Sequence, residues 1–460
     1  MHVGIFLKNF LPFSIYASGV LSALLALGGN TRWALLMITV LMPLRNIVEK
    51  VQDYPGGCQF IDILIASSII GWAVSSSSRH RKFFEKSSLN IIVVILVVYL
   101  FFSLLLGSNY LYGGFIVNIH DSRVQDWKNF CLLPVIFYLI LNNTFTKKEI
   151  WTLVAVMTLA MLIMDYYTIN QIRWYSSLQS REKITATFQF LGPNEVAAFF
   201  NEYTIILMSL FFVIKDFWKR ILLVAVILLN LYCITFTYSR GAYGGMAIGM
   251  ALLFAFKNKK LLIPLILIVV FWQAILPQKA IERIKGTKNE YGQLDESSQR
   301  RINIWQQALD LFKKNPVFGI GYGVFRTLGL DLGDTHNIYV KTLTEQGLIG
   351  FLIFFTVLFC FMKEGFFLYQ KGEDELDKAL GLGFFICIFI LIFNNFFGDR
   401  WSYMEPNAFL WVFAALVCRL NASAKTPDKP AEIKQEIKED IKSPAAGAVK
   451  LKKKLRYYDM

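Results

Sequence analysis

Long apolar segments alternate with short polar ones along most of the chain. Residues 89–106 and 261–276 contain no charged side chain, and an α-helix of ~17–25 mainly apolar residues is long enough to cross a bilayer. Candidate spans lie near 12–28, 31–45, 60–75, 89–107, 129–142, 150–167, 190–214, 220–237, 241–256, 260–276, 346–362, 380–397 and 405–420. The strands of an outer-membrane barrel would alternate polar and apolar residues. The pattern therefore predicts a polytopic α-helical membrane protein.

Basic residues cluster in four of the short loops between these spans. The four loops are 79–86, 147–148, 215–220 and 257–260. Even numbers of spans separate them, and loops rich in Lys and Arg stay on the cytoplasmic side of a membrane. We expect all four on that side. The opposite, outer side then carries residues 168–189, 238–240, 277–345 and 398–404.

The first two candidate spans are short and leave the count open. Thirteen spans with a cytoplasmic C-terminus would place the N-terminus outside, whereas twelve would place both ends inside. We predict an all-α bundle of about twelve spans. Its parts are transmembrane helices over 1–276 and 346–420, a large, partly helical periplasmic loop over 277–345, and a polar cytoplasmic tail over 421–460.

Composition and charge exclude several other classes of protein. Apolar residues make up 55% of the 460 residues, above the ~45–50% of globular proteins. The formal net charge is +14, but most Lys and Arg lie in short loops between spans, so we expect no nucleic-acid partner. The six cysteines show neither CxxC nor Cys/His ligand spacing, so we expect neither a metal site nor disulfides.

The outer segment 277–345 is too long for a passive connection, since loops beyond ~12–15 residues are usually functional or disordered. Its first part, 278–300, is charged, and we expect it to be flexible. An amphipathic helix follows at 301–313. Its apolar stripe is formed by Ile302, Trp305, Leu309 and Phe312. Helical phase places Arg301 at the edge of this stripe and points Arg300 towards water.

A glycine-rich stretch and a histidine complete this segment. Glycines at 319, 321 and 323 permit tight turns, but no strand precedes them, so the likeness to a nucleotide-binding loop is superficial. Asp334 or Thr335 can cap a helix that begins at 338. His336 would then lie in the first helical turn, at the outer mouth of the next span. Its position fits a functional residue and a mere helix start equally well.

Two more polar interruptions lie on the outer side. Arg240 is wedged between two apolar spans, and an arginine near membrane depth normally faces a protein interior or a water-filled cavity. The alternative is that its side chain snorkels to the headgroups. Asn194 and Glu195 follow Pro193 at the start of another helix, where Glu195 suits the helix dipole.

In this order, the motifs resemble the O-antigen ligase and polymerase family. These are integral-membrane glycosyltransferases that use polyprenyl-diphosphate-linked glycans. The similarity covers roughly residues 185–360. It comprises Gly192-Pro-Asn194, Ser239-Arg-Gly241, Arg301 with Trp305, Asn315-Pro-x-x-Gly-x-Gly-x-Gly323, His336-Asn337 and Glu345-x-Gly-x-x-Gly350.

The resemblance implies roles for individual residues. Arg240 and Arg301 would bind the diphosphate of the donor, with Arg300 as the rival of Arg301, and His336 would be the catalytic residue. Asn194, Asn337 and Glu345 are further candidates for the site. The partners would be the lipid-linked glycan donor, a glycan acceptor and membrane lipids. The setting would be the bacterial inner membrane.

The expected chemistry agrees with these residue types. A diphosphate leaving group gains negative charge as the sugar C1–O bond breaks, and two arginine forks can stabilise that charge. A neutral histidine can accept the proton of the attacking hydroxyl. Attack opposite the diphosphate inverts the anomeric centre. The outer loops carry no carboxylate cluster or metal-ligand spacing, so a reaction without metal or cofactor is the simpler hypothesis.

The acceptor is left open by these motifs. We predict ligation of O-antigen to lipid A-core first, growth of a polysaccharide chain second and transfer to a protein hydroxyl third. A competing class is a flippase that transports a lipid-linked glycan without chemistry. Transporters often show two matching halves with interrupted helices, and no such halves are visible in the sequence.

Overall fold

The computed structural model describes residues 2–78, 83–175, 180–286, 296–329 and 334–424, and every regular element in these ranges is a helix. Nine of the described helices are long and apolar enough to cross a membrane. They are α1 (His2–Leu27), α4 (Phe60–Ser78), α5 (Asn90–Tyr112), α6 (Ser122–Asn143), α7 (Lys147–Trp174), α9 (Phe217–Phe236), α16 (Ile338–Lys371), α17 (Glu375–Asn394) and α18 (Met404–Ala424). The predicted multi-span all-α architecture is confirmed, whereas the count of about twelve stays a prediction.

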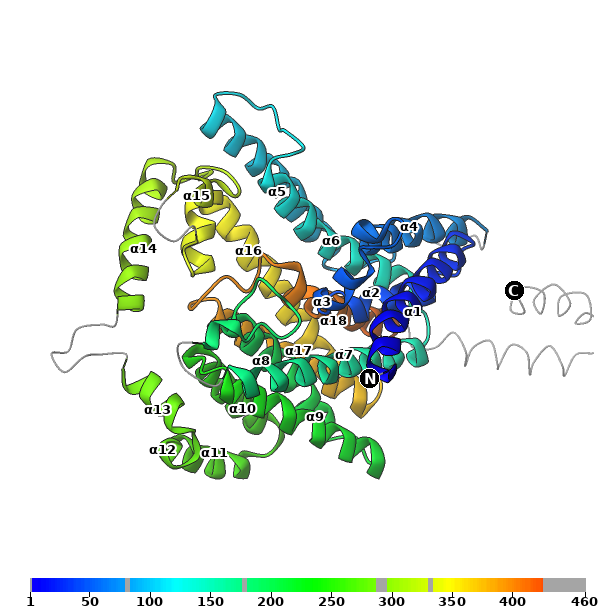
Figure 1. Cartoon of the computed structure of the whole chain (residues 1–460), viewed down its shortest axis with the longest axis vertical. Helices are drawn as coiled ribbons and strands as arrows, with labels where there is room; N and C mark the ends of the chain where they lie inside the picture. The colour runs from blue at the N-terminus through cyan, green and yellow to red at the C-terminus, as the bar shows by residue number, and fades with distance from the viewer. Residues whose placement is uncertain (1, 79–82, 176–179, 287–295, 330–333, 425–460) are drawn as a thin grey trace, which may run out of the picture.

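Four helices fall short of this criterion although the apolar pattern predicts spans there. They are α2 (Arg32–Leu41), α8 (Pro193–Phe211), α10 (Arg240–Lys257) and α11 (Leu262–Val270). The remaining described helices are α3 (Arg45–Val48), η1 (Glu49–Val51), η2 (Gly57–Gln59), η3 (Arg181–Lys183), η4 (Lys259–Leu261), α12 (Trp272–Ile275), α13 (Gln278–Lys285), α14 (Glu296–Lys314) and α15 (Val324–Thr327). In Figure 1, α13 and α14 lie at the left edge of the bundle.

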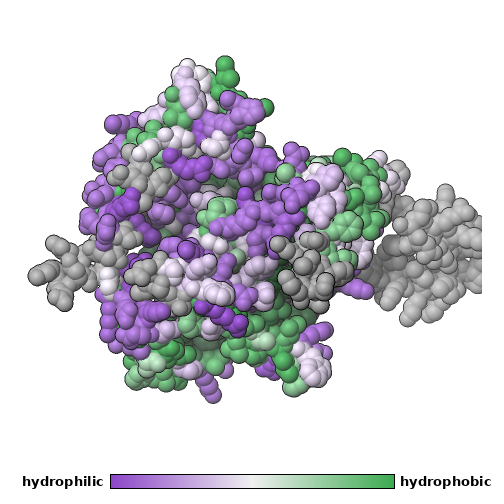
Figure 2. Space-filling view, viewed as in Figure 1, coloured by the Kyte–Doolittle hydropathy of each residue, from purple (hydrophilic) through white to green (hydrophobic). Residues whose placement is uncertain are grey.

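The centre of the bundle is formed by helices from both halves of the chain. Helix α17 packs against α16, α8 and α10, and α18 packs against α6 and α16. Most of α18 is buried, whereas α9 and α11 expose apolar side chains such as Leu228 and Ile263. Figure 2 shows hydrophobic residues along the lower edge of the molecule, where α9 and α11 lie in Figure 1. Exposed apolar side chains of this kind suit contact with lipid.

The connections between helices gather at two opposite ends of the bundle. At one end, which we call the basic end, Lys147 pairs with Asp374 at 2.8 Å and Thr31 bonds to Asn143. At the other, which we call the site end, Arg45 pairs with Glu405 at 2.7 Å. The segments 181–192, 237–240, 334–338 and 395–405 also contact one another there. This grouping agrees with the predicted alternation of loops, while the side of the membrane that each end faces stays a prediction.

The predicted loop 277–345 is partly helical, as expected. The expectation that the segment 278–300 is flexible is wrong for the first and the last residues of that segment. Residues 278–285 form α13, which buries Ala280 and Ile281, and α14 already begins at Glu296. Apolar side chains anchor these turns against the body. Residues 287–295 lie outside the described ranges, as does the predicted tail beyond 424.

The glycine-rich stretch 319–323 forms backbone hydrogen bonds to both α5 and α16. The N–H groups of Ile320 and Gly321 donate to the carbonyls of Thr344 and Glu345 at 2.9 and 2.8 Å, and the N–H of Tyr322 donates to Ser103 in α5. Gly321 has a φ of +106°, and a Cβ there would collide with the backbone of Gly107. Close backbone approach therefore requires glycine at this position.

We predict that Gly321→Ala destabilises the protein. The added methyl group must displace the α5 backbone, an overpacking that typically costs ~1–3 kcal/mol, and the positive φ costs about 1–2 kcal/mol more. Thermal unfolding of the detergent-solubilised protein measures the loss. Gly329→Ala is the matched control, because Gly329 has a φ of +66° but open space around its Cα. Equal decreases in melting temperature in the two variants would contradict a specific role for close backbone packing at Gly321.

Candidate functional site

Helix α14 lies against the site end through a stripe displaced by about one residue from the one predicted. Ile304 and Ala308 are its most buried side chains, and they pack with Ile320, Val324 and Phe325. Trp305 is half-buried, and its indole Nε1–H donates to the carbonyl of Thr335 at 2.8 Å. The predicted stripe of Ile302, Trp305, Leu309 and Phe312 is half-buried throughout, so it lies on the buried side of α14 but about one residue out of phase with the most buried line.

The buried side of α14 includes Arg301, whereas Arg300 lies on the exposed side. Arg301 precedes Ile304 by one helical turn and so lies on the same side as the buried stripe. It is half-buried and lines a cavity, whereas Arg300 is exposed and lies outside that cavity. The expected difference between the two neighbouring arginines holds in the structure.

This cavity, which we call the arginine cavity, has a volume of about 330 Å³. Every charged side chain that lines it within the described ranges is an arginine. The four are Arg240, Arg283, Arg301 and Arg400. Asn194 and Trp305 lie on the same walls. Guanidinium groups around one cavity suit an anionic ligand, although an ion pair with Glu195 offsets the charge of Arg400.

Two helices begin at the arginine cavity. Arg240 is the first residue of α10, and Asn194 is the second residue of α8. Backbone N–H groups at a helix N-terminus carry partial positive charge and favour anions such as phosphate. Gly245 lets α10 approach α17 closely, since a Cβ there would lie 2.8 Å from Asn394 Oδ1. Small residues beside Arg240 therefore seat it within the bundle, as expected.

Residues that sequence reasoning missed hold these side chains in place. Arg181 is buried and donates to Asn194 Oδ1 at 3.0 Å and to the carbonyl of Thr237 at 3.2 Å. Arg400 is also buried and forms an ion pair with Glu195. Glu195 thus has a specific partner besides the helix dipole. Arg400 lies in the predicted outer loop 398–404. Its positive charge and the predicted outer location of this loop are the two features of the sequence that could have identified it.

The loop 334–337 leads directly into α16. Asn337, and not Asp334 or Thr335, caps α16: its side chain accepts from the N–H groups of Tyr339 and Val340. The predicted caps are therefore wrong, and His336 lies just before the helix instead of in its first turn. The Thr335 hydroxyl instead donates to the carbonyl of Asn337 at 2.9 Å, which turns the chain before the cap.

His336 adopts a left-handed backbone conformation with a φ of +49°. Tyr238, two residues before Arg240, has a φ of +53°. Such conformations cost bulky residues ~1–3 kcal/mol and concentrate at functional sites. The backbone is therefore strained at both Tyr238 and His336, in two segments near the arginine cavity.

Burial lowers the pKa of His336 below its usual 6.5. Arg301 and Arg400 lower this pKa further, whereas Asp334 and Glu195 oppose them. The imidazole is therefore neutral at pH 7. These interactions also place the ring within electrostatic range of two arginines of the arginine cavity.

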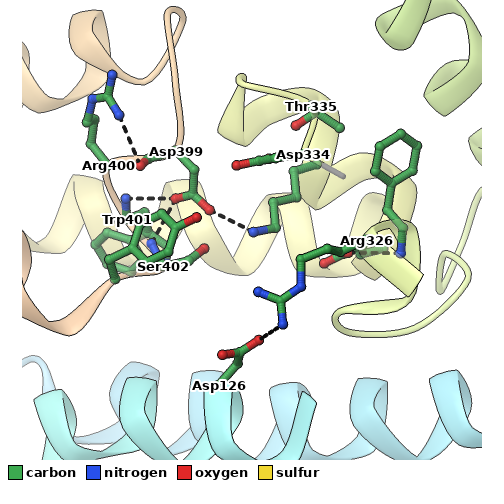
Figure 3. Close-up of polar contacts among 12 residues, drawn as sticks. Asp126, Arg326, Asp334, Thr335, Asp399, Arg400, Trp401 and Ser402 are labelled. Atoms are coloured by element: carbon green, nitrogen blue, oxygen red, sulfur yellow. Dashed lines mark hydrogen bonds and ion pairs between the residues drawn. The ribbon is translucent and has the colours of Figure 1, made fainter. Parts of the chain in front are cut away.

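Glu345 borders a different cavity. This second cavity has a volume of about 370 Å³, and no described residue lines both it and the arginine cavity. Glu345 is buried there and accepts from the N–H of Phe325 at 3.2 Å. Figure 3 shows Asp334 and Thr335 on one side of this region and the segment Asp399–Ser402 on the other. The structure thus brings Arg240, Arg301 and Asn194 together, with His336 beside them, and places Glu345 apart.

Comparison with known proteins agrees with these motifs. Residues 224–355 match the sequence model of the family described as O-antigen ligase. This segment is similar to the O-antigen ligase family. The match contains Arg240, Arg301 and His336, while Arg400 and Asn194 lie outside it. The resemblance inferred from the sequence is therefore confirmed.

A relative from Haemophilus influenzae is 26% identical over 251 residues. The alignment covers 47% of this chain and 60% of the relative, which is described as an uncharacterized protein. The chain therefore spans about 60% of that relative's length. Because the description of this relative names no activity, the similarity gives no information on function beyond the O-antigen ligase match.

Proposed function

We propose that this protein is an inverting membrane glycosyltransferase that moves a glycan from a polyprenyl diphosphate to an acceptor hydroxyl. The arginine cavity carries the proposal, because four arginines and two helix N-termini surround one space. Such a site matches the charge that a diphosphate leaving group develops. The match to the O-antigen ligase family supports the same class of enzyme.

The proposed reaction assigns one step to each part of the site. The acceptor oxygen attacks C1 of the donor sugar, the C1–O bond to the diphosphate breaks, and its electron pair stays on the diphosphate. Arg240 and Arg301 stabilise that charge through bidentate hydrogen bonds. His336, which is neutral at pH 7, takes the proton of the hydroxyl. The arginines provide the charge stabilisation, so we propose that neither metal nor cofactor is needed.

For the acceptor, we propose lipid A-core first, a growing polysaccharide second and a protein hydroxyl third. The family description as O-antigen ligase supports this order. We place the enzyme in the bacterial inner membrane with residues 277–345 in the periplasm, because the basic loops are expected in the cytoplasm.

Purified protein given lipid-linked glycan and acceptor should release polyprenyl diphosphate and form the glycoside without ATP and in the presence of EDTA. Removal of the protein from cells should leave free polymer and unmodified lipid A-core if it is a ligase. Single glycan units would accumulate instead if it is a polymerase. Transport of the lipid-linked glycan without transfer to any acceptor class would overturn the proposal in favour of a flippase.

We predict that Glu282→Cys, in a Cys58→Ser background, reacts with a membrane-impermeant maleimide once the outer membrane is permeable. Glu282 is an exposed residue of α13, and Cys58 is itself an exposed thiol near the site end. Lys148→Cys is the control, because Lys148 is exposed at the basic end and should react only after the inner membrane is opened. The reverse pattern would reject the proposed orientation.

A further inference from the structure

The second cavity extends along the site end into a longer groove. A further cavity of about 170 Å³ adjoins it. The two share Arg45, Asn129, Met404 and Glu405 in their walls. Together they form what we call the paired groove, which runs from Asp334 towards Asp62. The groove begins at Asp334, two residues from His336, and shares no described lining residue with the arginine cavity.

The paired groove differs from the arginine cavity in that acidic as well as basic side chains line it in the described ranges. Each basic side chain that lines it in the described ranges forms an ion pair with an acidic one. The pairs are Arg45–Glu405 at 2.7 Å, Lys128–Asp62 at 2.6 Å, Arg326–Asp126 at 2.8 Å and Lys341–Asp399 at 2.8 Å. Figure 3 shows the Arg326–Asp126 pair. Glu49, Asp334 and Glu345 add further carboxyl groups to the walls, so a phosphate would meet neutralised cations and extra acids.

The walls of the paired groove suit a ligand rich in hydroxyl groups. Carboxylates and side-chain amides such as those of Gln52 and Asn129 offer many acceptors and donors. Phe190 and Tyr403 add aromatic surface at 6.1 Å between ring centroids, and the Arg45 guanidinium lies over Phe190 at 4.7 Å. Apolar faces with a few placed polar groups are typical of small-molecule sites.

We propose that the paired groove binds an uncharged stretch of the acceptor glycan, several sugars long. The reacting sugar lies at the Asp334 end, beside His336, and the following sugars lie along Arg45 and Asn129 towards Asp62. The proposal rests on the proposed glycosyl transfer and specifies its acceptor. In this proposal, residues of α3, η2 and α6 recognise the sugars that follow the reacting sugar.

The test uses the full chain in nanodiscs and the oligosaccharide released from lipooligosaccharide of cells that lack this protein. Binding is measured by thermophoresis before and after phosphatase treatment, and transfer is measured separately. Gln125→Trp and Asn129→Trp place bulk in the groove from α6. We expect each to weaken binding and raise the acceptor KM about tenfold or more, with the donor KM unchanged. Phosphatase treatment should leave binding equal or stronger.

Ser122→Trp is the matched control, because Ser122 is an exposed residue of α6 outside the groove, and it should behave as wild type. A raised donor KM in the groove variants would show that the donor glycan lies there and would overturn the proposal. So would tighter binding of the phosphorylated oligosaccharide or no binding by wild type. Wild-type binding without transfer would instead refute the proposed function and leave the groove assignment standing.

Discussion

His336→Ala should lower turnover by about 10²–10⁴-fold, the usual scale for a lost general base. Donor binding should largely survive, since Arg240 and Arg301 line a separate part of the site. Burial lowers the pKa of His336 below 6.5, so the neutral base predominates at pH 7. Activity should therefore be constant from pH 7 upwards and fall only below pH 6.5, as protonation removes the base. Single-turnover rates across this pH range provide the measurement.

His336→Asn separates catalysis from support of the loop. Asparagine tolerates a positive φ better than most residues and keeps a hydrogen-bonding side chain, but it cannot accept a proton at neutral pH. We expect this variant to fold normally and to be as inactive as His336→Ala. An active asparagine variant with the wild-type pH profile would remove His336 from the mechanism.

Arg240→Ala and Arg301→Ala should each lower kcat by about 10²–10³-fold, as expected when one group that stabilises a developing anion is lost. The acceptor KM should change little, because both side chains line the arginine cavity and not the paired groove. Steady-state kinetics with each substrate varied in turn distinguish these effects. Lysine at either position should rescue only partly, since a point charge lacks the bidentate fork.

Arg300→Ala is the matched control for Arg301→Ala. The two residues are adjacent on α14, but Arg300 is exposed outside the cavity. We expect it to retain near-wild-type turnover. A dead Arg300 variant beside an active Arg301 variant would show that the assignment of inside and outside on α14 is reversed.

The case of α14 shows what helical periodicity alone can predict. The sequence indicated a helix and the correct side for Arg301, because an error of about one residue in phase still leaves i and i+3 on one face. It did not indicate which partner the indole of Trp305 would bind. That depends on the carbonyl of Thr335, which the chain brings near only through its tertiary path.

The arginines of the site show where sequence reasoning stops. Arg240 was conspicuous because apolar spans flank it, and membrane energetics single out such a residue. Arg181 and Arg400 lie in polar loops, where charge is unremarkable. Their burial and their bonds to Asn194 and Glu195 follow from the packing of α8 against the loop just before it, which carries Arg181, and against a loop 205 residues later, which carries Arg400. The apolar pattern predicted the helices, but it carries no information about which loops meet.

The ion pair between Arg400 and Glu195 also bears on how the protein is made. Its two residues are 205 positions apart, and a ribosome adding ~5–20 residues per second needs about 10–40 s to cover that distance. Arg240 and His336 will both have been synthesised before Arg400 exists. A nascent chain halted before the last two helices are in place therefore lacks one wall of the arginine cavity. Assembly order thus delays completion of the arginine cavity until synthesis is nearly finished.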